Sequence, residues 1–240
     1  MSYDWKAALV FLAVLVAVTV TGRWLAFRVP ALARMRALNR EADAKKLARE
    51  RVRKGVAASN RAGLLTNAFF YVAVLPFCLS LAPRPLWRHA LDAAVVLLVF
   101  DFFYYLTHRF LFHGKALRRV HALHHEARTP TYVDALYVHW LETTIGLVLF
   151  LGSIPLVAAV SGAPLSAYSM AVATLLFTQL NTINHTFVNL PEFPFRWLSR
   201  ITWIHAAHHV DMNHGNYATL TMLYDRLFGT YEEPVQRATP

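Results

Sequence analysis

Five apolar runs divide this chain, and each is close to the length of a membrane-spanning helix. An α-helix needs roughly 20 apolar residues to cross the hydrocarbon core of a bilayer. The first run covers 7–21 and reaches Phe27 if the Arg23 side chain extends toward the lipid headgroups. The other four runs are 64–81, 90–112, 138–160 and 165–190. The pattern predicts an all-α fold, a polytopic membrane bundle of four or five helices that cross or dip into the bilayer.

A cleaved signal peptide is the alternative interpretation of the first run. Such a peptide has a positive start, a short apolar core and a cleavage site of small residues. Here Asp4 precedes the run together with Lys6, and no clear small-x-small site follows it. We therefore expect a retained N-terminal transmembrane helix.

The segment that follows, 28–61, is basic and helix-prone. Twelve of the 24 Lys and Arg residues lie between Arg23 and Arg61. The segment is predicted to be an amphipathic helix on an anionic membrane surface, or else a solvated cytosolic helix. With the first run it forms a predicted N-terminal unit, 1–63, ahead of a main membrane domain, 64–240.

This charge distribution also predicts which side of the membrane each segment occupies. Segments rich in Lys and Arg stay in the cytosol. When that orientation is carried through five spans, the ends of two runs, Phe112 and Leu190, fall on the cytosolic side too. A hairpin of 138–190 that only dips into the bilayer would give the same sidedness. The polar segments 113–137 and 191–240 are therefore predicted to form one cytosolic cap, called the cap below.

Composition supports a multi-pass membrane protein. The chain is 56% hydrophobic and only 16% charged, whereas soluble domains carry about 25% charged residues. The formal net charge of +10 does not indicate a nucleic-acid partner, because the basic residues do not alternate with an aromatic platform. The one cysteine, Cys78, lies in an apolar run, so disulfide frameworks and thiolate metal sites are excluded.

Histidines concentrate where the apolar runs meet the cap. Two H-x-x-H-H motifs lie about eighty residues apart, and a further pair ends the third run. On a helix, positions i, i+3 and i+4 share one face, so each motif should present three imidazoles in one direction. Eight of the 12 histidines thus form three clusters: His108 and His113; His121, His124 and His125; His205, His208 and His209.

These clusters predict a site with two metal ions. There are too many imidazoles for one tetrahedral zinc, and imidazole suits iron, zinc and copper alike. Without a metal, many buried nitrogens would need other partners. A metal transporter is the less favoured alternative, because transporter sites lie near the bilayer midplane and these clusters lie at its edge. His89, in a short loop beside Trp87, is expected to be only hydrogen-bonded.

The ordered motifs resemble the fatty acid hydroxylase/sterol desaturase superfamily, a group of integral-membrane di-iron oxygenases. The resemblance covers about 95–232 and is carried by 101–113, the two H-x-x-H-H motifs, 213–217 and 225–231. Ala218 stands where the superfamily usually has glycine, and Tyr224 where it usually has tryptophan. These departures bear on the substrate more than on the fold.

The resemblance implies a set of metal ligands and cofactors. Two iron ions would use O2 as co-substrate, with electrons from an external reductase and a ferredoxin- or cytochrome-type carrier, because the chain has no flavin or dinucleotide glycine motif. The roles of His139 and His214 stay open. His139 is either a ligand or a helix-end residue, and His214 is either a ligand or a residue with a lid or supporting role. The implied ligands are His108, His113, His121, His124, His125, His185, His205, His208 and His209.

Two carboxylates are predicted to support this site. Asp101 lies seven residues before His108 and hence on nearly the same helix face. A carboxylate within a membrane span is costly and usually functional. Asp101 is therefore predicted to accept a hydrogen bond from a ligand imidazole, and Asp225 to do the same from the C-terminal segment.

The predicted function is an O2-dependent lipid hydroxylase that oxidises a C–H bond of a fatty acyl chain, a sterol or a related lipid. Desaturation by the same site is the alternative, and the His108-to-His113 spacing, which is similar to the hydroxylases of the superfamily, favours hydroxylation. A non-redox zinc-dependent membrane protein is the alternative from another class. An inactive membrane scaffold is disfavoured because every motif histidine is present.

Overall fold

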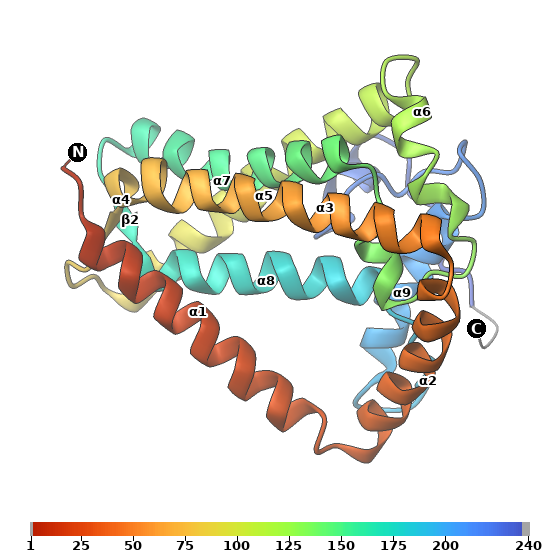
Figure 1. The fold of residues 1–240 in the computed structure, drawn as a ribbon. Coiled ribbons are helices and arrows are strands. Elements are labelled where there is room, and N and C mark those ends of the chain that lie inside the picture. Colours follow the sequence, from red (N-terminus) through yellow and green to blue (C-terminus); the bar gives the residue numbers. More distant parts are fainter. Residues whose placement is uncertain (1, 237–240) are drawn as a thin grey trace.

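The computed structural model describes residues 2–236, and its fold is an all-α bundle with a cap at one end (Figure 1). Two two-residue strands, β1 (Leu79–Ser80) and β2 (Leu165–Ser166), pair in parallel at the other end. The predicted all-α class is therefore confirmed. The long helices are α1 (Trp5–Ala26), α2 (Pro30–Leu47), α3 (Glu50–Phe69), α5 (Leu86–Thr107), α7 (Trp140–Ser161) and α8 (Ala167–His185).

Four helical segments within residues 2–236 are long and apolar enough to cross a membrane: Trp5–Ala26, Glu50–Cys78, Leu86–Phe112 and Trp140–Ser161. The fifth apolar run forms α8, which is not among them. Its second half carries Gln179, Asn181 and Asn184, which lower its hydropathy. Helix α8 nevertheless packs against α1 and α5 in the bundle. The chain is thus a membrane protein with four candidate spans and one more polar helix in the same bundle.

The second span begins earlier than its apolar run. Its helix starts at Glu50 within the basic segment and continues through a π-helical turn, Phe70–Val74, into the short α4, Leu75–Cys78. The basic segment is therefore two helices, α2 and the start of α3, rather than one. Helix α3 runs unbroken through position 63. The predicted boundary between units 1–63 and 64–240 therefore coincides with no helix end, and the division stays a prediction.

Helix α2 is held against the rest of the molecule by buried polar side chains. The Asn39 side chain donates to the Phe187 carbonyl, at 2.8 Å, and accepts from its backbone N–H, at 2.9 Å. Asp43 accepts from the Thr131 hydroxyl, at 2.7 Å, and from the Val133 N–H, at 3.1 Å. These contacts fix α2 to both the 131–133 segment of the cap and the end of α8.

Three aromatic rings hold α5, α7 and α8 together in the core. Phe150 and Phe177 stack with ring centroids 4.0 Å apart, and Phe100 packs edge-on against both, at 5.6 and 5.0 Å. Such pairs stabilise a core by about 0.5–1.5 kcal/mol each beyond the area they bury. This packing fixes the helix ends that carry His108, Glu142 and His185.

The cap consists of short helices between and after these spans. They are α6 (Arg118–His121), η3 (His124–Glu126), η4 (Tyr132–Ala135), α9 (Arg196–His208) and α10 (Leu223–Leu227). The π-helical turn η2 (His108–Phe112) comes just before the cap and continues α5. In Figure 1, α6 and α9 lie at the end where α2 also lies. The sequence prediction that the two polar segments meet at one end of the bundle is confirmed, and which side of the membrane they occupy stays a prediction.

Candidate metal centre

All nine predicted ligand histidines converge where the cap meets the bundle. Eight of them form two groups in which the ligand nitrogens lie within 4.8 Å of one another. All eight side chains are buried, at 0–9% exposure. The first imidazole group comprises His108, His113, His121 and His208, and the second comprises His124, His185, His205 and His209.

Each H-x-x-H-H motif contributes to both groups, so the expectation of three imidazoles in one direction is corrected. In the first motif, α6 ends at His121 and a new 3-10 turn begins at His124, which directs the two rings differently. In the second motif, His205 and His209 are about 40° apart around the helix axis, while His208 lies about 100° from His209. A helix face of that width presents imidazoles to both groups.

The hydrogen bonds of the first group define which nitrogens are free to bind a metal. The Nδ1 atoms of His108, His113 and His208 donate to backbone carbonyls of Tyr217, Met212 and Gly215, at 2.7, 2.9 and 2.7 Å. A carbonyl only accepts, so the proton is assigned to Nδ1 and each Nε2 carries a lone pair. These lone pairs all point into the space that the group surrounds.

The spacing of those Nε2 atoms fits a bound cation. His108 Nε2 and His121 Nε2 lie 3.0 Å apart, and lone pairs at that distance repel each other. Metal–nitrogen bonds of about 2.1 Å separate two ligands by about 3 Å when the bonds meet at right angles. The donor set of the first group therefore fits a metal that imidazole favours.

The Nε2 atoms of the second group converge in the same way. His185 donates from Nδ1 to the Asn181 carbonyl, at 2.9 Å. Its Nε2 lies 2.9 Å from His205 Nε2 and 3.3 Å from His124 Nε2, and His205 Nε2 lies 3.1 Å from His209 Nε2. Four imidazole nitrogens thus converge a second time, which fits a second ion.

His125, the ninth predicted ligand, lies beside the first group. Its Nε2 is 3.1 Å from His121 Nε2 and 3.0 Å from His208 Nε2. Its ring also stacks on His209 of the second group, with centroids 4.9 Å apart. The first motif therefore places one imidazole at the boundary between the two groups.

Burial keeps these imidazoles neutral. It lowers the pKa of His121, His124, His208 and His209 well below the usual value, and it lowers the pKa of His125 to about 3. A buried charge is costly, so the unprotonated ring persists at neutral pH. Neutral imidazole is the form that binds a metal.

Glu142 is a site residue that the sequence reasoning did not assign. It lies in the first turn of α7, is 7% exposed, and its Oε1 is 3.0 Å from His121 Nδ1. A carboxylate that accepts a hydrogen bond from the Nδ1–H group fixes the ring orientation and raises the basicity of Nε2. The sequence offered the same signal for Glu142 as for Asp101, because each is a carboxylate within an apolar run.

Asp101 contacts backbone amides rather than an imidazole, which corrects its predicted contact. Its carboxylate accepts from the N–H groups of residues 219–221, at 3.0–3.2 Å, and from the Thr221 hydroxyl, at 2.7 Å. The predicted contact of Asp225 with an imidazole is corrected too, because its carboxylate accepts from the N–H groups of Tyr217 and Ala218, both at 2.8 Å. The two carboxylates together hold the 217–221 segment, whose Tyr217 carbonyl accepts from His108.

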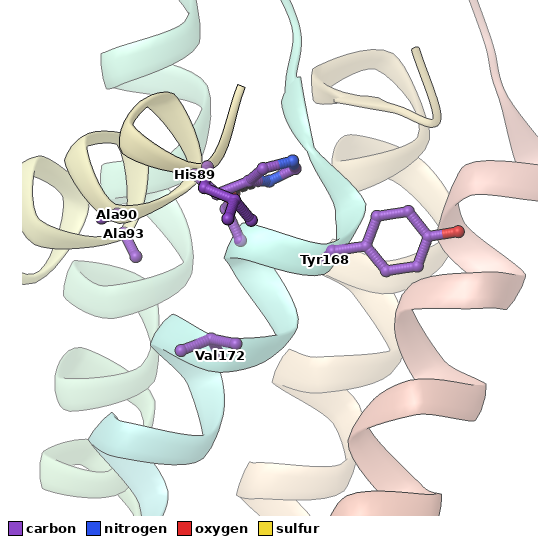
Figure 2. A pocket seen from close by; sticks show the side chains of 7 residues that line it. His89, Ala90, Ala93, Tyr168 and Val172 are labelled. Atoms are coloured by element: carbon purple, nitrogen blue, oxygen red, sulfur yellow. Dashed lines mark hydrogen bonds between the residues drawn. The ribbon is translucent and has the colours of Figure 1, made fainter. Parts of the chain in front are cut away.

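The three remaining candidate histidines lie outside both groups. His139 caps the start of α7 by accepting from the Leu141 N–H, which matches the helix-end alternative, and His214 pairs with Asp211 at 3.2 Å. His89 lies at the opposite end of the bundle, where its Nδ1 is 2.8 Å from the Ser169 hydroxyl. It lines a cavity of about 380 Å³ with Tyr168 and others (Figure 2). His89 is hydrogen-bonded, as expected, but it lies in the first turns of α5 rather than in the predicted loop.

Residues 93–230 match the sequence profile described as Fatty acid hydroxylase, and this match covers more than half of the chain. The chain belongs to the fatty acid hydroxylase family. The matched region contains both imidazole groups, Glu142 and the two carboxylates that hold 217–221. This match confirms, for residues 93–230, the resemblance found in the motifs.

Curated relatives of this fatty acid hydroxylase family member include proteins from animals, bacteria and plants. Methylsterol monooxygenase 1 of Rattus norvegicus is 32% identical over 136 residues, 54% of this chain and 43% of its own length. Ornithine lipid hydroxylase OlsE of Rhizobium tropici is 28% identical over 151 residues, 62% and 44% of the two chains. Protein CER1-like 2 of Arabidopsis thaliana is 29% identical over 159 residues, 62% and 25%. The chain therefore spans less than half the length of these relatives.

No solved structure matches the chain.

Replacing Asp101 tests its role in holding the 217–221 segment. Asp101→Ala leaves three backbone N–H groups without their acceptor, and each such loss costs about 1–3 kcal/mol. We expect Asp101→Ala to lower both the melting temperature and the metal content, and Asp101→Asn, which keeps one acceptor oxygen, to lower them less. Thermal unfolding and metal analysis of the purified proteins measure both effects.

Asp92 provides the matched control on the same helix. It is 3% exposed and pairs with Arg84 and Arg88 at the far end of α5. Asp92→Asn should lower the melting temperature without changing the metal content. A wild-type metal content in Asp101→Ala would show that Asp101 only packs the helix.

Proposed function

We propose that this protein is a membrane-bound oxygenase that uses O2 and external electrons to hydroxylate a C–H bond of a lipid. The observation that carries the proposal is the pair of four-imidazole groups at one end of an apolar helix bundle, in a chain of the fatty acid hydroxylase family. Relatives named as a methylsterol monooxygenase and an ornithine lipid hydroxylase support an oxidised lipid as the product.

Each imidazole group would hold one metal ion, with His125 beside the first group. The nitrogen donors suit iron, zinc or copper, and the superfamily resemblance selects iron. A bound pair of iron ions supplies the redox chemistry that activates O2 toward an unactivated C–H bond. We infer that an external reductase and a ferredoxin- or cytochrome-type carrier supply the electrons. The positive-inside rule favours the cytosolic face for this site.

The chain's own residues orient the ligand nitrogens of the first group before an ion binds. The Tyr217, Met212 and Gly215 carbonyls, together with Glu142, hold the Nδ1–H groups and so direct every Nε2 of the first group inward. Such preorganised donors need no rearrangement when the ion binds.

Aromatic rings shield the first group from water. Phe112 stacks on His121 with centroids 5.2 Å apart, and Tyr104 packs edge-on against His108 at 5.3 Å. Both belong to the α5–η2 segment, which is a candidate membrane span. Apolar side chains of a candidate span thus lie directly beside the imidazoles, which supports a fatty acyl, sterol or related lipid of the bilayer as the substrate.

An isotope experiment tests the proposal. The purified protein is loaded with ferrous iron and supplied with a reductase system, total lipid extract and ¹⁸O2. We expect a lipid alcohol that carries the label. An unlabelled alkene would assign desaturation instead, and turnover without oxygen, or with zinc in place of iron, would contradict the oxygenase assignment.

A further inference from the structure

A groove of about 870 Å³ runs along the outer surface between α3 and α7. On the α3 side it is lined by Ala58, Ala62, Leu65 and Phe69, and on the α7 side by Trp140 and Val148. Its volume falls within the roughly 300–1,000 Å³ of sites that bind small ligands. The groove is separate from the metal centre, because Trp140 and Val148 are exposed while Glu142 of the same helix is buried against His121.

Small side chains create this groove. On the inner side of the contact, the Ser59 and Thr143 hydroxyls lie 2.7 Å apart, and Gly63 lies close to Leu147 and Thr143. The two helices therefore approach closely there. On the outer side, alanines leave the space between the helices unfilled, while Leu65 and Phe69 stay 62% and 59% exposed. Apolar side chains exposed on a candidate span face lipid chains.

The groove extends from the membrane interface toward the hydrocarbon core. Arg61 lines it and is the last basic residue before the apolar stretch 62–78, and Trp140 is the first residue of α7. Arginine and tryptophan are enriched at headgroup depth, where the arginine side chain extends to the polar layer. Phe69 and Val148 lie about two turns or more further along their helices, at the depth of acyl chains.

Arg61 supplies an unpaired positive charge at the headgroup end. Its side chain is exposed, and it forms no ion pair or hydrogen bond with any side chain in the part of the chain that the structure describes, 2–236. A guanidinium matches the geometry of a phosphate and can bind two of its oxygens. We propose that this groove binds an anionic glycerophospholipid, whose phosphate contacts Arg61 and whose acyl chain lies between α3 and α7.

Native mass spectrometry of the detergent-purified full chain tests this site. The protein is equilibrated with equal amounts of phosphatidylglycerol and phosphatidylcholine, and the retained lipids are counted. We expect preferential retention of one phosphatidylglycerol. One arginine near a membrane surface contributes about a fivefold preference for anionic lipid, so Arg61→Gln should reduce the preference by about fivefold.

Three further variants separate the groove from general surface charge. Arg34→Gln removes the same charge from an exposed position of α2 and should leave the preference unchanged. Ala58→Phe fills the groove and should abolish retention of both lipids, whereas Ala58→Ser keeps the groove open and should retain them. Melting temperature and metal content confirm that each variant is folded.

Three results would overturn the proposal: an unchanged preference in Arg61→Gln, an equal loss in Arg34→Gln, or full lipid retention in Ala58→Phe. None of these measurements depends on turnover, so they are independent of the proposed oxygenase activity.

Discussion

Replacing His208 with alanine is expected to remove one metal ion and to lower turnover by more than about 100-fold. His208 Nε2 is one of four nitrogens in the first imidazole group, and it lies 3.0 Å from His125 Nε2. Loss of a residue that only supports a ligand typically costs about 10–100-fold in metal affinity or activity, so loss of a ligand should cost more. Metal analysis and a lipid oxidation assay on the purified variant measure both quantities.

The second group provides an independent repeat of this experiment. His124 belongs to the second group although it stands three residues from His121 of the first, so His124→Ala should empty the other metal position with a similar loss of turnover. His89→Ala, at the opposite end of the bundle, is the control and should change neither quantity. Full metal content with full turnover in either cap variant would show that the altered residue is not a ligand.

Replacing Glu142 is expected to have the second largest effect. Its buried carboxylate accepts a hydrogen bond from the Nδ1–H group of His121. Glu142→Gln keeps the size and one acceptor oxygen but removes the negative charge that raises the basicity of His121 Nε2. We expect metal affinity to fall about 10–100-fold, as is typical for residues that support a metal ligand, and Glu142→Ala to be worse.

Competition with a metal chelator measures that affinity directly. Glu126→Gln is the control, because Glu126 lies in the cap and pairs with Arg51 at the surface, with its side chain 43% exposed. A purely structural role of Glu142 would lower the melting temperature and leave the metal affinity at the wild-type value. That outcome would remove Glu142 from the metal centre.

The sequence predicted the bundle because its signal is strong and local. Long apolar runs specify helices of membrane length, since each backbone polar group must be paired within the helix. The boundaries were less predictable. Charged residues from Glu50 onward precede the apolar run, yet their backbone continues the same helix, α3. Hydropathy marks where lipid begins rather than where the helix begins.

The metal centre was also predictable only in part, because the motifs are local while tertiary contacts decide how the side chains group. The H-x-x-H-H motifs predicted which histidines gather, but the break between α6 and the turn at His124 decides which group each ring joins. Asp101 and Glu142 were equally visible as carboxylates in apolar runs. Only the fold determines that Asp101 faces the 219–221 amides while Glu142 faces an imidazole.

The metal-to-protein ratio of the purified wild-type chain tests the central claim most directly. The two four-imidazole groups predict two bound ions per chain, both iron, in protein produced with sufficient iron and isolated without chelators. Mass spectrometry of the metals together with quantitative amino-acid analysis gives this ratio. A ratio of two irons supports the account, whereas a single ion per chain, or zinc in both positions with no iron uptake, would contradict it.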